Sequence, residues 1–114
     1  MQNTRQNRIC RLIQQDMGDI FLKETKSVFG PSLITVTQVR ITPDLSIARI
    51  YVSLMMIGGG TKEGLMQLIR ENTPDLRRRL GLREGKQLRI IPQLEFYLDD
   101  TLDYIENIER LLKQ

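Results

Sequence analysis

The amino-acid sequence predicts an α+β fold, a two-layer sandwich in which helices cover one face of a three-stranded sheet. Some segments carry apolar residues at the three- and four-residue spacing of amphipathic helices, and others are rich in β-branched residues or alternate apolar with polar side chains. With 114 residues, 40% of them hydrophobic and 27% charged, the chain is long enough for one hydrophobic core. We therefore expect residues 1–114 to form a single domain.

The first predicted element is an amphipathic helix over residues 5–26. Its apolar residues recur at helical spacing and are Ile9, Ile13, Met17, Ile20 and Phe21. We interpret the opposite, charged face as solvated, with Asp19 and Lys23 as an i,i+4 ion pair. Cys10 falls on the buried side, and Phe29-Gly30-Pro31 ends the helix.

A β-hairpin is predicted next. Residues 34–41 are rich in β-branched side chains, and residues 46–55 alternate apolar and polar positions. The core-facing residues of the second strand are Ala48, Ile50, Val52 and Leu54. Thr42-Pro43-Asp44-Leu45 forms the turn between them, because Pro favours its second position and Asp can bond its own backbone.

A broken helix follows three consecutive glycines at positions 58–60. Thr61 can cap its first half, whose apolar residues are Leu65, Leu68 and Ile69. Pro74 opposes a continuous helix, while Thr73 as N-cap and Pro74 at the first position favour a new start. We predict a short second half that buries Leu76 and Leu80 and ends at Gly81.

A third strand is predicted over residues 86–98, and Pro92 within it favours an edge position or a bulge. Asp99 and Asp100 can start a last helix, whose apolar stripe is Leu102, Ile105, Ile108 and Leu112. The order is α-β-β-α-kink-α-β-α. This order is similar to the bacterial (type II) arrangement of the KH domain, whose interrupted helix pair carries a loop that clamps nucleic acid.

The charges are segregated along the chain, although the net charge is only +3. Residues 70–89 carry a local charge of +4, and residues 95–114 carry −4. The basic stretch coincides with the helix break, so a helix amino terminus and outward-facing arginines could bind phosphate together. The candidate RNA-binding residues are Arg70, Asn72, Thr73, Pro74, Arg77, Arg78, Arg79, Arg83, Lys86 and Arg89. The alternative is a short, solvated helix whose arginines keep the domain soluble.

A secondary candidate is the outer face of the sheet, which we expect to be antiparallel. Arg40, Arg49 and Tyr51 would lie there, where an aromatic ring among cations can stack on bases. The alternative is the ordinary polar face that an antiparallel sheet turns to water.

Three absences narrow the function. The chain has no histidine, which excludes histidine-dependent catalysis, and its single cysteine excludes an intrachain disulfide. It has no apolar run of membrane-spanning length, and its amino terminus is polar. We expect a cytoplasmic protein that is not an enzyme and needs no cofactor, membrane or small-molecule substrate.

Two segments, Val36–Ser53 and Leu88–Leu102, resemble the ribosome-binding factor A family. The resemblance implies a non-enzymatic KH-like factor, expected to be a monomer, that binds the immature small ribosomal subunit and its ribosomal RNA and assists late maturation and rRNA processing. The family has an Ala-x-Gly kink between its central helices. Here Asn72-Thr73-Pro74 stands at that position, so proline supplies the break. The alternative is a protein-interaction module that docks on a ribosomal protein, with incidental RNA contact.

Overall fold

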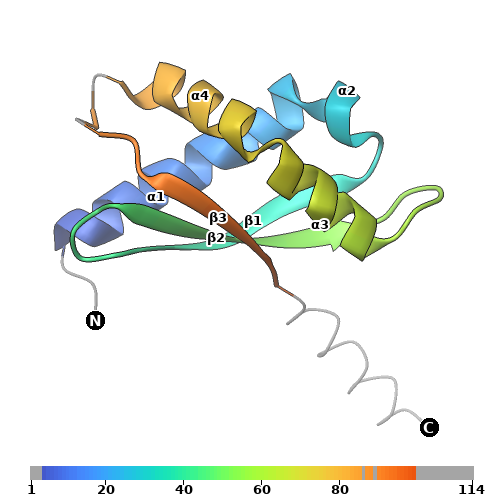
Figure 1. Ribbon diagram of the computed structural model, residues 1–114, viewed down its shortest axis with the longest axis horizontal. Coiled ribbons are helices and arrows are strands. Elements are labelled where there is room, and N and C mark those ends of the chain that lie inside the picture. Colours follow the sequence, from blue (N-terminus) through green and yellow to red (C-terminus); the bar gives the residue numbers. More distant parts are fainter. Residues whose placement is uncertain (1–3, 86, 89, 100–114) are drawn as a thin grey trace, which may run out of the picture.

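The computed structural model describes residues 4–85, 87–88 and 90–99, which form two layers (Figure 1). The helical layer contains α1 (Thr4–Asp19), a π-helical turn (Ile20–Glu24), α2 (Lys26–Phe29), α3 (Lys62–Glu71) and α4 (Thr73–Glu84). The sheet contains β1 (Leu33–Ile41), β2 (Ile47–Met55) and β3 (Gln93–Leu98), in the order β1-β2-β3. All the labelled helices lie on one face of the sheet, which confirms the predicted α+β sandwich. The predicted last helix lies outside the described residues.

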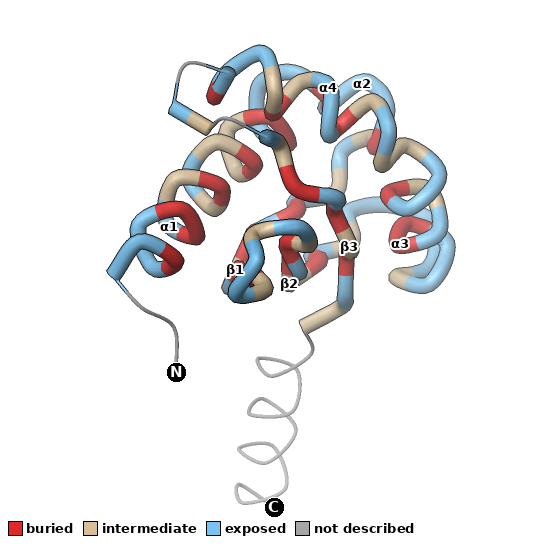
Figure 2. The backbone as a smooth tube through the Cα atoms, turned by 60° about the vertical axis from the view of Figure 1, so that its left-hand side comes forward, coloured by how far each residue is buried: buried red, intermediate tan, exposed pale blue. Residues whose placement is uncertain are grey.

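The hydrophobic core lies between the layers, and Figure 2 shows buried residues on the facing sides of α1, α3 and the strands. Ala48, Ile50 and Val52 of β2 are completely buried, as the alternation predicted. Cys10 is buried on α1, also as predicted. Within the described part of the chain, no helix combines the length and apolar character needed to cross a membrane.

The first predicted helix is not continuous to residue 26. The N–H and Oγ1 of Thr25 both donate to the carbonyl oxygen of Ile20, at 3.0 and 3.2 Å. This five-residue step widens the end of α1 into the π-helical turn, and α2 follows as a separate short helix. The predicted apolar stripe is nevertheless buried along its whole length.

The sheet is mixed, so the expectation of an antiparallel sheet is wrong. β1 and β2 form the predicted antiparallel hairpin, with a bulge at Thr37 between the Val36–Val52 and Gln38–Tyr51 pairs. β3 pairs with β2 in parallel, which requires the long crossover through α3 and α4.

The hairpin turn forms as predicted. The Asp44 carboxylate accepts hydrogen bonds from the Oγ and N–H of Ser46, at 2.7 and 3.1 Å. These bonds, with one from Thr42, hold the pKa of Asp44 below its ordinary value. They also hold Leu45 at a φ of 63°, a left-handed conformation that is uncommon for a residue other than glycine.

The third strand begins at Gln93, seven residues later than predicted, and Pro92 directly precedes it. The apolar alternation before Pro92 is misleading, because Ile90 is 77% exposed in the connection from α4. The edge position predicted from Pro92 is confirmed, since among the described strands β3 pairs only with β2.

The helix break lies where the sequence predicted it. Thr61 caps α3 by accepting a hydrogen bond from the Gly64 N–H at 3.0 Å. α4 begins at Thr73 with Pro74 in its first turn, and the N-cap is Asn72 rather than Thr73.

The second half of the broken helix is longer than predicted, because α4 continues past Gly81 to Glu84. Gly81 serves packing instead of ending the helix. A Cβ atom at this position would lie 3.4 Å from Cγ1 of Ile91, which is van der Waals contact, so Gly81 lies directly against the connection before β3.

The free edge of β1 is bonded by side chains of α1. Gln14 donates to the carbonyl oxygen of Val36 at 3.2 Å, and Gln6 makes a longer contact of 3.5 Å with that of Ile41. These two glutamines therefore attach α1 to the sheet by polar contacts beside the apolar core.

Glu84, at the end of α4, is a buried carboxyl group that faces no hydrogen-bond donor. It is completely buried, and neither oxygen has a donor within hydrogen-bond distance. Its polar neighbour is the carboxylate of Asp16 on α1, which can only accept a hydrogen bond. Burial, and then Asp16, raise the pKa of Glu84 to about 8, so the group is a neutral acid that can donate to Asp16.

Because of Glu84, the free energy of unfolding should fall as pH rises between 4.5 and about 8. The chain has no histidine, so no imidazole titrates in this window. Its pKa is about 8 when folded and near its ordinary 4.5 when unfolded, so the folded chain binds the extra proton between these values. The free energy of unfolding should therefore decrease as pH rises through this window. Glu84→Gln should flatten that decrease and raise stability above the window by about 2 kcal/mol, measured by urea unfolding at each pH. Glu63→Gln, on the exposed start of α3, should leave the parent slope unchanged; equal slopes in all three chains would contradict this assignment.

Candidate nucleic-acid interface

The polar residues at the helix break turn back onto α3. The side chain of Asn72 donates to the carbonyl of Leu68 at 2.8 Å, and Thr73 Oγ1 donates to that of Ile69 at 3.2 Å. Both bonds satisfy carbonyl groups at the end of α3. Pro74, without an N–H, is exposed at the start of α4. The structure thus places Asn72, Thr73 and Pro74 together, with two of the three side chains occupied within the fold.

Two arginines flank the break, and they bond backbone carbonyl groups of β3 and of the residues directly before it. Arg70 Nε and Nη2 donate to the carbonyl of Phe96 at 3.3 and 3.1 Å. Arg77 Nε donates to Pro92 at 3.0 Å, and its Nη2 donates to Ile91 at 2.6 Å. Because their partners are neutral carbonyl groups, neither contact cancels the positive charge of its arginine.

A cleft of about 400 Å³ lies between the break and the start of β3. Its walls come from two elements far apart in the sequence, and its lining residues are Thr73, Pro74, Arg77, Gln93 and Leu94. The cleft therefore combines the helix break, a positively charged side chain and an exposed strand edge.

The arginines farther along α4 are paired with carboxylates. Asp75 Oδ1 and Oδ2 lie 2.8 Å from Arg78 and Arg79, which hold the pKa of Asp75 below its ordinary value, Arg79 having the larger effect. Arg83 lies 2.7 Å from Glu24, and its hydrogen bond is the main cause of the lowered pKa of Glu24. Of these three arginines, Arg78 is the most exposed, with 60% of its side chain accessible.

Arg83 also reaches α1, where Asp19 and Asp16 lie 3.5 and 3.8 Å from its Nη1. The i,i+4 spacing predicted that Asp19 pairs with Lys23. In the structure Asp19 faces Arg83 instead. Sequence reasoning missed this cluster, because its acidic and basic members lie about sixty positions apart in the chain. Lys86 and Arg89 lie outside the described residues.

The secondary candidate residues come together on the uncovered face of the sheet. Tyr51 stacks on Tyr97, with ring centroids 5.5 Å apart, and the Tyr97 hydroxyl donates to Glu95 at 2.8 Å. Glu95 also accepts from Arg49 at 3.2 Å, and these two bonds, that of Tyr97 first, lower its pKa. Arg40 lies directly opposite Arg49 in the strand register.

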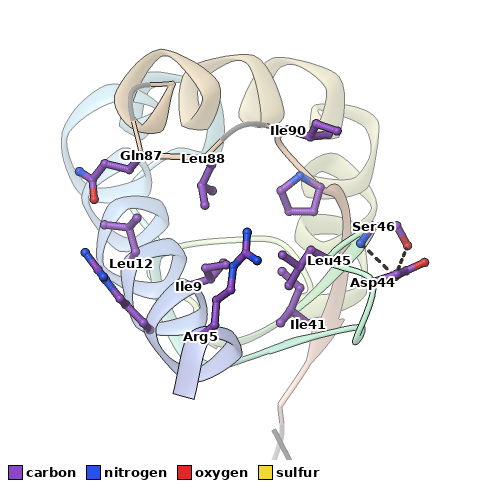
Figure 3. Close-up of a pocket in the computed structure, with 12 residues that line it drawn as sticks. Arg5, Ile9, Leu12, Ile41, Asp44, Leu45, Ser46, Gln87, Leu88 and Ile90 are labelled. Carbon is purple, nitrogen blue, oxygen red and sulfur yellow. Dashed lines mark hydrogen bonds between the residues drawn. The ribbon is translucent and has the colours of Figure 1, made fainter. Parts of the chain in front are cut away.

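A larger groove of about 630 Å³ opens between α1, the hairpin turn and the connection before β3 (Figure 3). Its walls are mainly aliphatic, with Ile9 and Leu45 among them, and Arg5 and Arg8 also line it. None of the described candidate RNA-binding residues lines it.

Arg77 should contribute to stability and its neighbour Arg78 should not. Arg77→Ala removes both carbonyl contacts of α4 with the connection before β3 and should lower the free energy of unfolding by about 1–2 kcal/mol. Arg78→Ala removes one exposed ion pair and should change it by less than about 0.5 kcal/mol. Urea unfolding measures the free energy of unfolding of both variants. Equal losses in the two variants would show that the carbonyl contacts of Arg77 do not stabilise the fold more than the exposed ion pair of Arg78.

The sequence profile of the family described as "Ribosome-binding factor A" matches residues 5–112. A ribosome-binding factor A from Cytophaga hutchinsonii is 43% identical over the whole chain and 84% of its own length, and one from Prosthecochloris aestuarii is 41% identical over 96% of this chain and 88% of its own. The crystal structure of ribosome-binding factor A from Thermus thermophilus has a TM-score of 0.65 at 22% identity, covering 82% of this chain and 94% of its own. Coordinates of the Thermus thermophilus factor, fitted into a cryo-electron microscopy map of a 30S complex, have a TM-score of 0.61 at 23% identity. The match covers 79% of this chain and 90% of the fitted chain. The shared fold is consistent with the predicted KH-like arrangement. This chain belongs to the ribosome-binding factor A family.

Proposed function

We propose that this protein binds the immature small ribosomal subunit and its ribosomal RNA, and assists late maturation and rRNA processing. In this proposal residues 1–114 act as one domain, as a cytoplasmic monomer, by binding and not by catalysis. Family membership supports the proposal, and the Thermus thermophilus relative is described in a complex with the 30S subunit.

The proposed RNA site is supported mainly by the positive charge near the cleft, which no described carboxylate offsets. Arg70 and Arg77 bind neutral carbonyl groups, whereas Arg79 and Arg83 are balanced by carboxylates. Positive potential should therefore be greatest at the cleft and weaker toward the end of α4. A phosphate group at the cleft would meet Arg77 and the amino-terminal end of α4, and the charge of Arg70 would add longer-range attraction.

The break itself favours recognition of RNA backbone and shape. Pro74 offers no N–H to a phosphate, and Asn72 and Thr73 bond α3. Few groups at the break can therefore read base edges by hydrogen bonds, which sequence-specific RNA recognition requires. The arginines contribute long-range attraction and contact with phosphate oxygens.

The second candidate function is docking on a ribosomal protein, and one observation favours it. The engaged side chains of Arg70 and Arg77 leave fewer guanidinium donors for RNA than the sequence suggested. A protein-docking module would bind in a salt-tolerant way and have little affinity for naked RNA.

Salt dependence should distinguish the two functions. If the protein neutralises about four phosphates, the association constant for the small subunit should fall with a log–log slope of roughly −3 against salt concentration. Co-sedimentation with mature and precursor small subunits over a salt series measures this slope. A flat dependence would reject the RNA site and support docking on a ribosomal protein.

Charge reversal should locate the site without disturbing the fold. Arg78→Glu reverses an exposed charge on α4 next in sequence to Arg77, and because Arg78 is exposed the variant should stay folded while its binding to small subunits weakens about tenfold. Arg40→Glu makes the same charge change on the uncovered sheet face and should bind as the parent does. If Arg40→Glu is the weaker binder, the secondary candidate formed by Arg40, Arg49 and Tyr51 is the RNA surface instead.

A further inference from the structure

The groove between α1, the hairpin turn and the connection before β3 has no part in the proposed RNA site. Its volume of about 630 Å³ is in the range of pockets that enclose a ligand. It shares no lining residue with the cleft at the helix break. The groove is therefore a separate candidate for binding a partner.

The walls of the groove leave aliphatic surface in contact with water. Ile90 is 77% exposed, and Figure 3 shows Leu45 and Leu88 around the same opening. The described lining residues include no aromatic ring, so the groove lacks the stacking platform on which proteins bind unpaired bases. These walls therefore favour an occupant with aliphatic side chains over a nucleic acid.

The two arginines of the groove have no acidic partner among the described residues. Arg5 and Arg8 are exposed and lie about one turn apart on α1, and no described carboxylate forms an ion pair with either. The carboxylate of Asp44 also lines the groove, but on the hairpin side, where Thr42 and Ser46 bond it (Figure 3). The α1 side of the groove therefore favours a negatively charged group.

Hydrogen bonds hold two walls of the groove in place. Arg77 donates to the carbonyl groups of Ile91 and Pro92 and so fixes the connection before β3. In the hairpin turn, the bonds of Asp44 hold Leu45 at its φ of 63°. Because these walls are already ordered, less conformational entropy is lost when a partner binds.

We propose that this groove binds a segment of a partner protein in which a carboxylate lies next to aliphatic side chains. The aliphatic side chains cover Leu45 and Ile90, and the carboxylate pairs with Arg5 and Arg8. Small ligands are usually oriented by polar groups that converge on them, whereas here the two unpaired arginines lie on one helix. A protein segment fits this arrangement better, because its affinity comes mainly from the apolar surface that it buries.

This inference goes beyond the proposed RNA site and does not depend on it. The groove and the cleft have separate lining residues, so the two proposals can fail independently. Failure of the groove would appear in peptide binding and would leave the salt dependence of small-subunit binding unchanged.

Amide NMR of the full-length chain, titrated with synthetic peptides, tests the proposal. The probe is an acetylated peptide of alternating leucine and aspartate. The comparison is a peptide of the same length with lysine in place of aspartate. We expect the acidic peptide to shift the amide signals of Ile9, Leu45 and Ile90, and the basic peptide to leave them unchanged.

Two matched pairs of variants separate the contributions of charge and apolar contact. Arg5→Glu should weaken binding of the acidic peptide about tenfold, whereas Arg11→Glu, on the exposed surface of α1 outside the groove, should bind as the parent does. Ile90→Ser should also weaken binding about tenfold. Leu82→Ser should have no effect, because Leu82 is 76% exposed on α4 but does not line the groove. All the substituted side chains are exposed, so the variants should keep the fold.

Three results would overturn the proposal. If the acidic peptide shifts none of the groove amides, the groove is not a docking site for this chemistry. Equal binding of the acidic and basic peptides would show that the arginines do not select the partner. If single-stranded oligouridylate shifts the same amides at a lower concentration than the acidic peptide does, the groove is an RNA site instead.

Discussion

Two arginine side chains attach the broken helix to the free edge of the sheet, and the position of the cleft depends on this contact. In a parallel pair, alternate carbonyl groups of an edge strand point away from the neighbouring strand. Those of Pro92 and Phe96 point toward the helices and would lack partners without Arg77 and Arg70. One arginine lies before the break and one after it, so together they hold both halves of the helix against β3.

The same contact separates the basic residues of the chain into two kinds. Arginines bound to carbonyl groups keep an uncompensated positive charge. Arg79 and Arg83, in contrast, form a cluster with Asp75, Glu24 and the acidic residues of α1, whose negative charges offset theirs. The cluster joins α4 to α1 by charge, beside the buried acid at Glu84. A local charge of +4 in the sequence therefore does not become a uniform basic surface.

Sequence reasoning predicted the elements that short-range patterns determine. The hairpin, its turn at Asp44, the Thr61 cap and the break at Pro74 depend on residues a few positions apart, and all were placed correctly. The late start of β3 and the passage of α4 through Gly81 were missed, because they depend on which side chains the folded connection covers. The partners of the arginines were missed for a related reason, since a guanidinium can bond any carbonyl or carboxylate that the fold brings near it. The candidate RNA-binding residues remain a proposal, now with Arg77 lining the cleft, Arg70 bonded to the Phe96 carbonyl of β3 and Arg78 exposed on α4.

The glutamines on β1 and the arginines on β3 have a joint consequence for the sheet. A strand from another molecule extends a sheet by bonding the free carbonyl and N–H groups of an edge. Here helical side chains already bond outward-pointing carbonyls on both edges, through Gln14 on one side and, on the other, through Arg70 on β3 and Arg77 at the residue directly before it. An incoming strand would have to displace these donors before it could pair. The helical layer thus makes a small three-stranded sheet resistant to strand addition, and so to aggregation through its edges, although the sheet is not closed into a barrel.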